Sequence, residues 1–302
     1  MRLTTMRAWF IAALALLLAA PVPAQQPSQR NEAPAPARPN GHYLESLLKE
    51  PQAQAPCPPG IEPIYQANVV VTGTDMRQRP WGFAQTLRAV LVRSSGDPRL
   101  KDDPRTASLA DKADTLVACF GYTDLMAGIP LHDDQGTYDR PHRLTVTFDP
   151  AKIDAILASL GDKPWRGERP VVVPVLLVKG PKPPPYMLSA EAPQGSEQRG
   201  AFATWAGELD MKLHIPSETQ LAGWGYAVDR APAAPPASSD GEAIVAGTLE
   251  WNEGLPGWVG TWRCRWHGAD RKWGISGVSY DAAFRDLIGG VMQLASGNGS
   301  PD

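Results

Sequence analysis

The chain has 302 residues, of which 43% are hydrophobic and 20% charged. These proportions are typical of a soluble globular protein. The hydrophobic residues are too few and too interrupted to form the several membrane-spanning helices of a polytopic membrane protein. With 29 basic and 32 acidic side chains, the net charge is −3. The chain therefore lacks the basic character on which nucleic-acid binding depends.

Residues 1–24 have the pattern of an export signal. Arg2 and Arg7 form a positive region, residues 8–20 are an uninterrupted apolar run, and small residues precede a cut after Ala24. That run is shorter than the roughly 20 residues of a membrane-spanning helix, so we expect a cleaved signal rather than an anchor. The mature chain is therefore predicted to be periplasmic, not integral to the membrane, and to carry a net charge of −5 without the two arginines.

Residues 25–60 are predicted to be a disordered leader, because eight prolines in 36 positions leave too little apolar surface for a core. The leader contains Cys57, which we expect to be exposed. Two further cysteines, Cys119 and Cys264, allow one disulfide from three possible pairings in an oxidising compartment. Cys264 alternates with tryptophans, which favours a buried thiol. None of the three has the C-x-x-C spacing of a redox catalyst.

Residues 61–162 predict a first α/β lobe in the order β-α-α-β-β-α. Strands are expected at 64–72, 117–127 and 143–148, and helices from Pro80 to Gly96, from Asp103 through Leu116, and from Pro150 to Gly161. The evidence is an aspartate followed by proline at two helix starts, glycine at two helix ends, and apolar residues at helical or alternating spacing between them.

Residues 170–296 predict a second α/β lobe. The nearly continuous apolar run 171–178 is typical of a strand covered on both faces. A short return strand at 186–190, a helix marked by Phe202, Trp205, Leu209 and Leu213, and a loop at 231–240 follow. Three antiparallel strands at 243–251, 258–267 and 272–278 then lead to a closing helix capped by Ser279.

Sequence patterns for chemistry give no catalytic, cofactor or metal residues. His132, Asp133 and Asp134 with Asp139 and His142 form the one cluster of possible metal ligands, in a segment with the composition of a polar turn. Ser46 and Lys49 match the S-x-x-K string of penicillin-recognising serine enzymes, but the accompanying elements are absent from the sequence. The sequence therefore predicts a protein that is not an enzyme and has no cofactor.

The carboxyl-terminal tryptophans are the most distinctive feature. Five of the nine mature tryptophans lie within residues 251–273, and alternation places Trp262 and Trp266 with Cys264 on one face and Arg263, Arg265 and His267 on the other. Exposed indoles, Trp258 and Trp262 above all, could stack on sugar rings. Alternatively the same indoles form the inner face beneath the closing helix, which needs an apolar partner. The sequence favours the core, and the Arg–His row could meet an acidic partner.

The first lobe resembles the exported proteobacterial family known as domain of unknown function 2066. The resemblance lies in Tyr65-Gln66-Ala67, Val70-Val71-Thr72-Gly73, Gly82-Phe83-Ala84, residues 95–100, 126–130 and 144–149, and in the tryptophan segment and residues 279–284 at the far end. It implies a periplasmic setting and no particular activity. The second lobe is similar, at the level of fold alone, to protein-binding envelope modules such as the amino-terminal domain of the Tol propeller protein.

The sequence as a whole favours a non-catalytic accessory or adaptor protein that contacts another protein of the cell envelope. Two alternatives remain: a glycan or peptidoglycan binder that uses residues 251–273, and a hydrolase with an unrecognised site. The first requires an exposed Trp258 or Trp262, and the second requires a pocket that gathers a histidine with a carboxylate.

Overall fold

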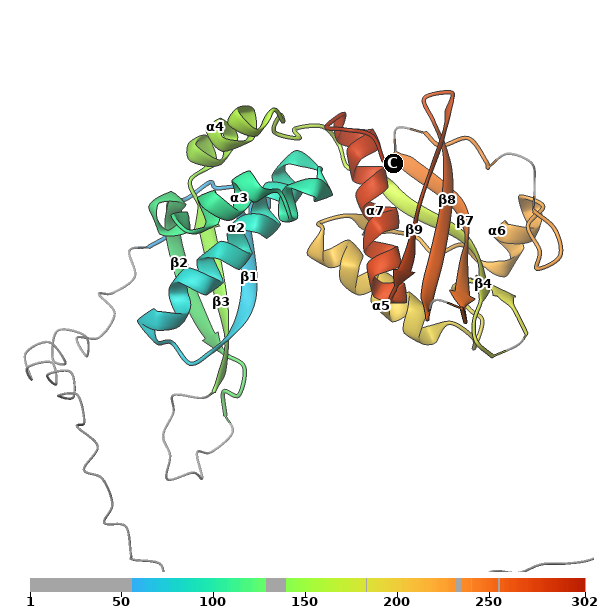
Figure 1. The fold of residues 1–302 in the computed structure, drawn as a ribbon, viewed down its shortest axis with the longest axis horizontal. Coiled ribbons are helices and arrows are strands. Elements are labelled where there is room, and N and C mark those ends of the chain that lie inside the picture. The colour runs from blue at the N-terminus through green and yellow to red at the C-terminus, as the bar shows by residue number, and fades with distance from the viewer. Residues whose placement is uncertain are drawn as a thin grey trace, which may run out of the picture. The chain divides into compact units, whose positions relative to one another are not determined.

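The computed structural model describes residues 56–128, 140–182, 184–231, 235–239, 241–254 and 256–301. The predicted signal and the predicted leader up to residue 55 lie outside these ranges, as do residues 129–139. Residues Ala53–Asp302 form one compact unit. The fold is α+β, as the sequence predicts, with two sheets that pack against helices (Figure 1).

The amino-terminal part contains a three-stranded antiparallel sheet in the order β1-β3-β2. Its helices pack on one face of this sheet, where Gly82 of α2 lies against Leu144 of β3. The caps agree with the predicted boundaries, since Asp149 accepts hydrogen bonds from two backbone amides of α4 and Gly161 ends that helix in the left-handed region. The elements are η1 (Pro63–Tyr65), β1 (Gln66–Thr72), η2 (Met76–Gln78), α2 (Arg79–Ser95), η3 (Pro98–Lys101), α3 (Pro104–Ala110), η4 (Ala113–Leu116), β2 (Val117–Asp124), β3 (Pro141–Phe148) and α4 (Pro150–Leu160).

The carboxyl-terminal part contains a larger mixed sheet in the order β5-β4-β7-β8-β9, with β6 also paired to β4. Strands β4 and β7 are parallel, and β7, β8 and β9 form an antiparallel meander. The elements are β4 (Val171–Lys179), β5 (Tyr186–Met187), α5 (Ser196–Glu208), β6 (Lys212–Leu213), α6 (Glu218–Gly223), β7 (Glu242–Asn252), β8 (Gly257–Trp266), β9 (Ala269–Val278) and α7 (Tyr280–Ser296).

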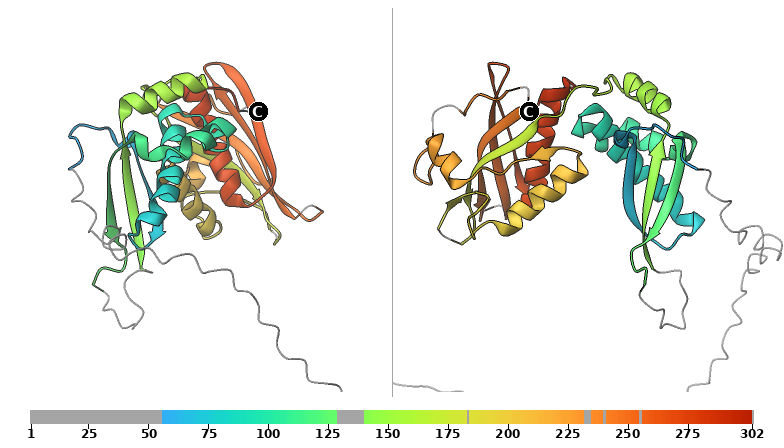
Figure 2. Two further views of the ribbon diagram at one scale, coloured as in Figure 1. Left: turned by 60° about the vertical axis from the view of Figure 1, so that its left-hand side comes forward. Right: turned by 180° about the vertical axis from the view of Figure 1, so that it is seen from behind.

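Helices cover both faces of this larger sheet. On one face α5 and α7 pack together, with the rings of Phe202 and Phe284 stacked 3.9 Å apart between their centroids. On the other face Leu221 of α6 packs against Val173 and Val175 of β4. Figure 1 and the view from behind in Figure 2 show α6 on the opposite side of the strands from α7. Strand β4 is thus buried on both faces, as its continuous apolar sequence predicts.

Three expected elements differ from those observed. The helix expected to reach Leu116 ends at Ala110, because the chain tightens there into turns whose hydrogen bonds span three residues. The helix expected to include Leu213 ends at Glu208, since Asp210 takes a left-handed backbone conformation and Leu213 pairs with β4. The return strand expected over 186–190 ends at Met187. Helical or alternating periodicity does not encode where these elements end.

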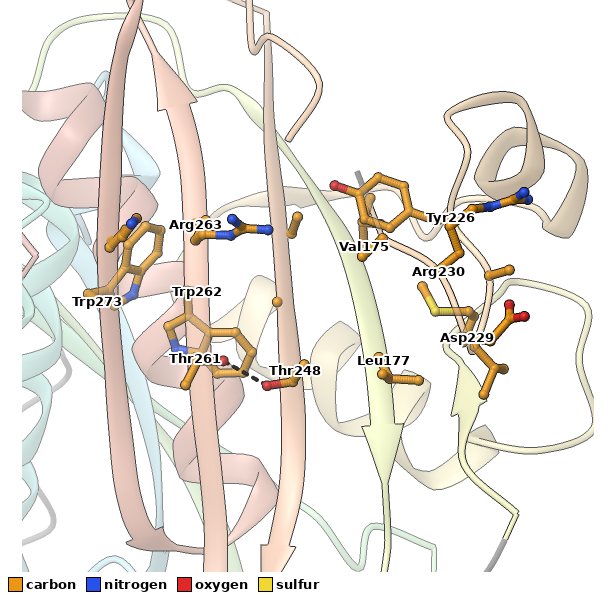
Figure 3. A pocket seen from close by; sticks show the side chains of 17 residues that line it. Val175, Leu177, Tyr226, Asp229, Arg230, Thr248, Thr261, Trp262, Arg263 and Trp273 are labelled. Atoms are coloured by element: carbon orange, nitrogen blue, oxygen red, sulfur yellow. Dashed lines mark hydrogen bonds between the residues drawn. The ribbon is translucent and has the colours of Figure 1, made fainter. Parts of the chain in front are cut away.

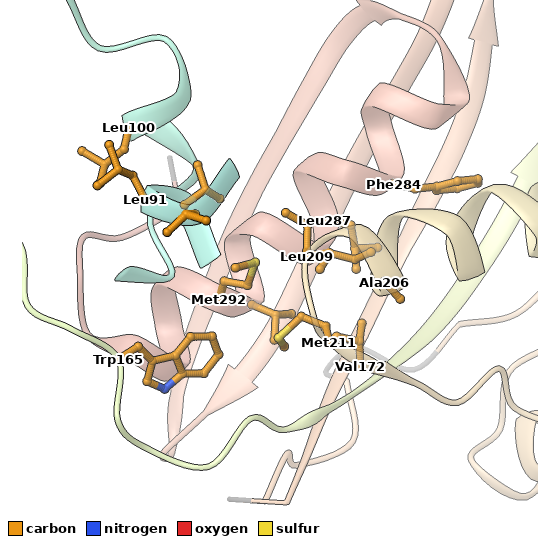
Figure 4. Packing of buried hydrophobic residues seen from close by; sticks show 14 of the residues in the cluster. Leu91, Leu100, Trp165, Val172, Ala206, Leu209, Met211, Phe284, Leu287 and Met292 are labelled. Carbon is orange, nitrogen blue, oxygen red and sulfur yellow. The ribbon is translucent and has the colours of Figure 1, made fainter. Parts of the chain in front are cut away.

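The two predicted lobes share one hydrophobic core. A single cluster joins Leu91 and Leu100 from the first lobe to Met292 of α7, and Trp165 of the connecting segment belongs to it (Figure 4). The predicted boundary at residues 163–169 is therefore a packed connection rather than a free linker. Within the described ranges, no helix combines the length and the apolar character that crossing a bilayer requires.

Asn298 ties the end of the chain to this connection. Its side-chain amide donates to the carbonyl oxygens of Ser95 and Lys163, each at 2.7 Å, and its Oδ1 accepts from the amide of Lys163 at 3.1 Å. We expect Asn298→Ala to lower the free energy of unfolding by about 2 kcal/mol, because backbone groups lose buried hydrogen bonds. Urea denaturation would measure the loss. Asn68→Ala, at an exposed position on β1, is the control and should leave stability nearly unchanged.

Candidate functional site

The carboxyl-terminal tryptophans belong to the core. Trp258, Trp262 and Trp266 are 8%, 1% and 8% exposed, and Trp273 is 7% exposed. The Trp262 indole donates a hydrogen bond from Nε1 to Asp286 of α7 over 2.9 Å. These side chains therefore fill the space between the sheet and the closing helix, and no exposed indole is present at the two positions that glycan stacking requires.

Glycines make room for these indoles. A Cβ atom added at Gly260 would overlap the Trp262 ring, and one added at Gly290 would overlap the Trp273 ring. At Gly247 the added atom would meet the backbone carbonyl of Thr261, which cannot rotate away. The alternation of glycine and tryptophan along β8 is thus a packing pattern in which an absent side chain accommodates a large one.

Asp286 gives the core a pH dependence. Burial raises the pKa of its carboxyl group above the usual value, while the hydrogen bond from Trp262 and the charge of Arg285 act in the opposite direction. A raised pKa in the folded state means that Asp286 contributes stability below its unfolded pKa, near pH 4, and that this contribution is lost as pH rises through the folded pKa. The ionised carboxylate is therefore a cost at neutral pH.

Asp286→Asn removes this ionisation and keeps an oxygen that can accept from Trp262. We expect the variant to be more stable than the parent at pH 7, with the difference disappearing as pH falls toward about 4. Urea denaturation across this pH range would measure it. Glu253→Gln, in an exposed turn, is the matched control. A constant difference at every pH would show that the ionisation of Asp286 is not the cause.

The predicted row of basic residues is divided between three environments. Arg263 lines a groove on the sheet face opposite α7. Arg265 lies next along β8, outside the groove lining, and its Nε is 3.9 Å from the Asp270 carboxylate. His267 follows the end of β8 in a turn with a positive φ angle of 47°, and its ring contacts Trp266. Of these three residues, Arg263 is the one that lines this groove.

The groove has a volume of about 700 Å³ and lies over β4, β7 and β8 (Figure 3). Val175 and Leu177 of β4 and Thr248 of β7 form its floor, and the hydroxyl groups of Thr248 and Thr261 are hydrogen-bonded at 2.7 Å. The segment 226–231, which follows α6, forms its wall. In Figure 3 the ring of Tyr226 lies over β4, and its hydroxyl is directed toward β7, on the side where the Arg263 guanidinium lies.

Charges at the groove are mainly positive. Arg230, Arg263 and Lys272 line it together with one acid, Asp229, whereas the chain as a whole has a net charge of −3. Burial raises the pKa of Tyr226, and the positive charge of Arg263 partly offsets this effect. Tyr226 therefore stays a neutral hydrogen-bond donor at physiological pH, beside a guanidinium.

This groove was not predicted from the sequence. No element was assigned between Leu213 and the loop at 231–240, yet α6 lies there and brings Tyr226 over the sheet. A local signal was present: Ser217 and Gln220 form a capping box, with each side chain accepting from the other residue's backbone amide. No local signal places Tyr226 beside Arg263, because their proximity depends on the sheet between them.

A second surface feature lies at one end of the first lobe. Of the five large hydrophobic side chains that are exposed in the described part of the chain, four are Val70, Met76, Trp81 and Leu125, which we call the apolar end. Three segments meet there: the turn after β1, the start of α2 and the end of β2. Arg79 donates a hydrogen bond from Nε to the Tyr122 hydroxyl at 3.3 Å, and the Gly73 amide donates one to the carbonyl oxygen of Arg140.

Candidate metal ligands do not gather in the described residues, where no group of three or more histidine, cysteine or acidic side chains is suitably placed. His132, Asp133, Asp134 and Asp139 lie outside the described residues. His142 lies on β3, and its Nδ1 is 2.8 Å from the carbonyl oxygen of Arg140.

In a comparison with known proteins, a family model other than the one that the sequence resembled matches part of the chain. Residues 60–166 match the model of a domain of unknown function, DUF8605. The resemblance to domain of unknown function 2066 is therefore wrong, because the matching model describes a different domain. No curated protein and no solved structure matches the chain.

Proposed function

We propose that the chain is exported and acts as a non-catalytic adaptor that binds another protein of the cell envelope through the apolar end. The observation that carries this proposal is that Met76, Trp81 and Leu125, with exposed fractions of 53%, 50% and 40%, belong to segments that meet at one end of the first lobe. Val70, which is 55% exposed, lies near the same end on the sheet face away from α2. Exposed apolar patches are characteristic of protein–protein contact surfaces.

The chemistry of the apolar end also suits a protein partner. Tryptophan, methionine and arginine are enriched where proteins contact one another, and a half-exposed tryptophan is a frequent energetic centre. Arg77 lies between Met76 and Trp81 in the sequence, is 87% exposed at its side chain, and pairs with Asp75 at 2.6 Å. The apolar end also lies within residues 60–166, the segment that matches the family model.

Two features support export. The first is the amino-terminal pattern of two arginines, an apolar run and small residues before position 25. The second is the disulfide between Cys57 and Cys119, which leaves Cys264 as a buried free thiol. Structural disulfides form in oxidising compartments such as the bacterial periplasm and are rare in the cytosol. The end of the leader is thus fixed to the first lobe by chemistry suited to that compartment.

Site-specific photo-crosslinking in cells tests the proposal. Benzoylphenylalanine would replace Trp81 in one version of the tagged chain and Val228 in another. Val228 is a matched control because it is 44% exposed and lies at the groove instead. We expect one envelope protein to be captured from position 81 and not from position 228, and Met76→Ser to reduce that capture.

Other outcomes would count against the adaptor. Equal capture from both positions would indicate non-specific contact, and retention of the tagged protein in the cytosol would contradict export. Material that is retained on cell-wall sacculi, with no protein captured at position 81, would support the glycan-binding alternative by a surface other than the buried indoles.

A further inference from the structure

The Tyr226 hydroxyl lies at the groove and has an unused hydrogen-bond donor. Tyr226 is 6% exposed, and its Oη has no hydrogen-bond partner among the described residues. Buried hydroxyl groups are normally hydrogen-bonded, and one that has no protein partner beside a concave site can donate to a bound molecule. Figure 3 shows this hydroxyl directed across the groove rather than into the wall behind it.

Positive charge faces this hydroxyl from the other side of the groove. Arg263 of β8 and Lys272 of β9 are direct cross-strand neighbours, so both side chains stand on the same sheet face. The charge of Arg263 acts on the Tyr226 hydroxyl. A guanidinium therefore faces a phenolic hydroxyl across the groove, and the Lys272 ammonium stands beside the guanidinium on β9, a set of donors that suits an anionic group.

Another part of the groove is apolar. Leu177 of β4 lines its floor, and Met187 and Val228 lie at the wall. A volume of about 700 Å³ is within the range of small-molecule sites. An apolar floor that continues from a cluster of donors matches a molecule with one charged end and a hydrocarbon body.

We propose that this groove binds a small amphipathic carboxylate. Its carboxylate lies between Arg263, Lys272 and the Tyr226 hydroxyl, and its hydrocarbon body lies over Leu177 and Met187. Asp229 and Arg230 at the wall have opposite charges, so the positive charge that remains for an anion comes from Arg263 and Lys272. The site is independent of the proposed adaptor function, since it lies on the second sheet and requires no partner protein.

Calorimetric titration of the purified mature chain with octanoate tests the proposal, with the uncharged octanol as the reference compound. We expect saturable binding of octanoate and much weaker binding of octanol. Arg263→Gln should weaken octanoate binding about tenfold or more, and Tyr226→Phe about fivefold, as for the loss of a charged and a neutral hydrogen bond. Tyr226→Phe removes no hydrogen bond to a described residue, so it should fold normally.

Arg265→Gln is the matched control, because it removes the same charge from the same face of β8 two residues beyond the groove lining. It should leave octanoate binding unchanged. Equal binding of octanol, equal weakening by Arg265→Gln, or no saturable binding up to the solubility limit of octanoate would each overturn the proposal. Tighter binding of octyl phosphate than of octanoate would overturn the assignment to a carboxylate.

Discussion

Replacing Trp262 by alanine is expected to lower the free energy of unfolding by about 3–5 kcal/mol, as for other large aromatic side chains deleted from a core. The side chain is 1% exposed, packs beneath α7 and donates its indole hydrogen to Asp286. Its removal would leave a cavity and also a half-buried carboxylate without its donor. Urea denaturation followed by circular dichroism would measure the change without relying on tryptophan fluorescence.

Trp81→Ala is the matched control for this experiment. Trp81 is 50% exposed at the apolar end, so its loss should change stability by no more than about 0.5–1 kcal/mol. If Trp262→Ala were no more destabilising than Trp81→Ala, the tryptophan segment could not be core, and the glycan-binding interpretation would regain its basis.

The disulfide is the second large contribution that we expect. Cys57 and Cys119 are 62 positions apart, and a cross-link that closes a loop of this length stabilises a protein by roughly 2–4 kcal/mol, mainly through the unfolded state. Cys119→Ser should therefore lower the free energy of unfolding by about that amount. Thermal or urea denaturation under non-reducing conditions would measure it.

Reductant provides the control for the disulfide. It should destabilise the parent chain toward the stability of Cys119→Ser and leave that variant unchanged. Cys264 should not affect this comparison, because its side chain is fully buried and burial raises the pKa of its thiol, which makes the thiol unreactive. Further destabilisation of Cys119→Ser by reductant would contradict the pairing of Cys57 with Cys119.

Most helices and strands could be predicted because residues close to each boundary in the sequence determine where the element begins or ends. Asp149 with Pro150 starts a helix and Gly161 ends it, and both effects act within one turn of the chain. The strands of the carboxyl-terminal meander were predicted for a similar reason, since alternation along β8 places Trp262 and Arg263 on opposite faces. Periodicity of this kind depends only on backbone geometry.

The candidate groove could not be predicted because it depends on contacts between distant segments. Tyr226 and Arg263 lie 37 positions apart in the sequence and are brought together by the sheet. The disulfide pairing is similar, because the sequence left three pairings open and the fold brings together the Cα atoms of Cys57 and Cys119 at 5.2 Å. The shared core of the two lobes has the same origin, since it joins Leu100 to Met292.

The parallel pairing of β4 with β7 has a consequence for how the chain folds. Residues 180–241, with α5 and α6 among them, separate the two strands. Pairing the strands therefore closes a long loop, which costs conformational entropy. Contacts of such high sequence separation slow folding. The meander β7-β8-β9 and α7 are by contrast local in sequence. We therefore expect β4 to pair with β7 late in folding, and this pairing to be the rate-limiting step in the folding of the carboxyl-terminal sheet.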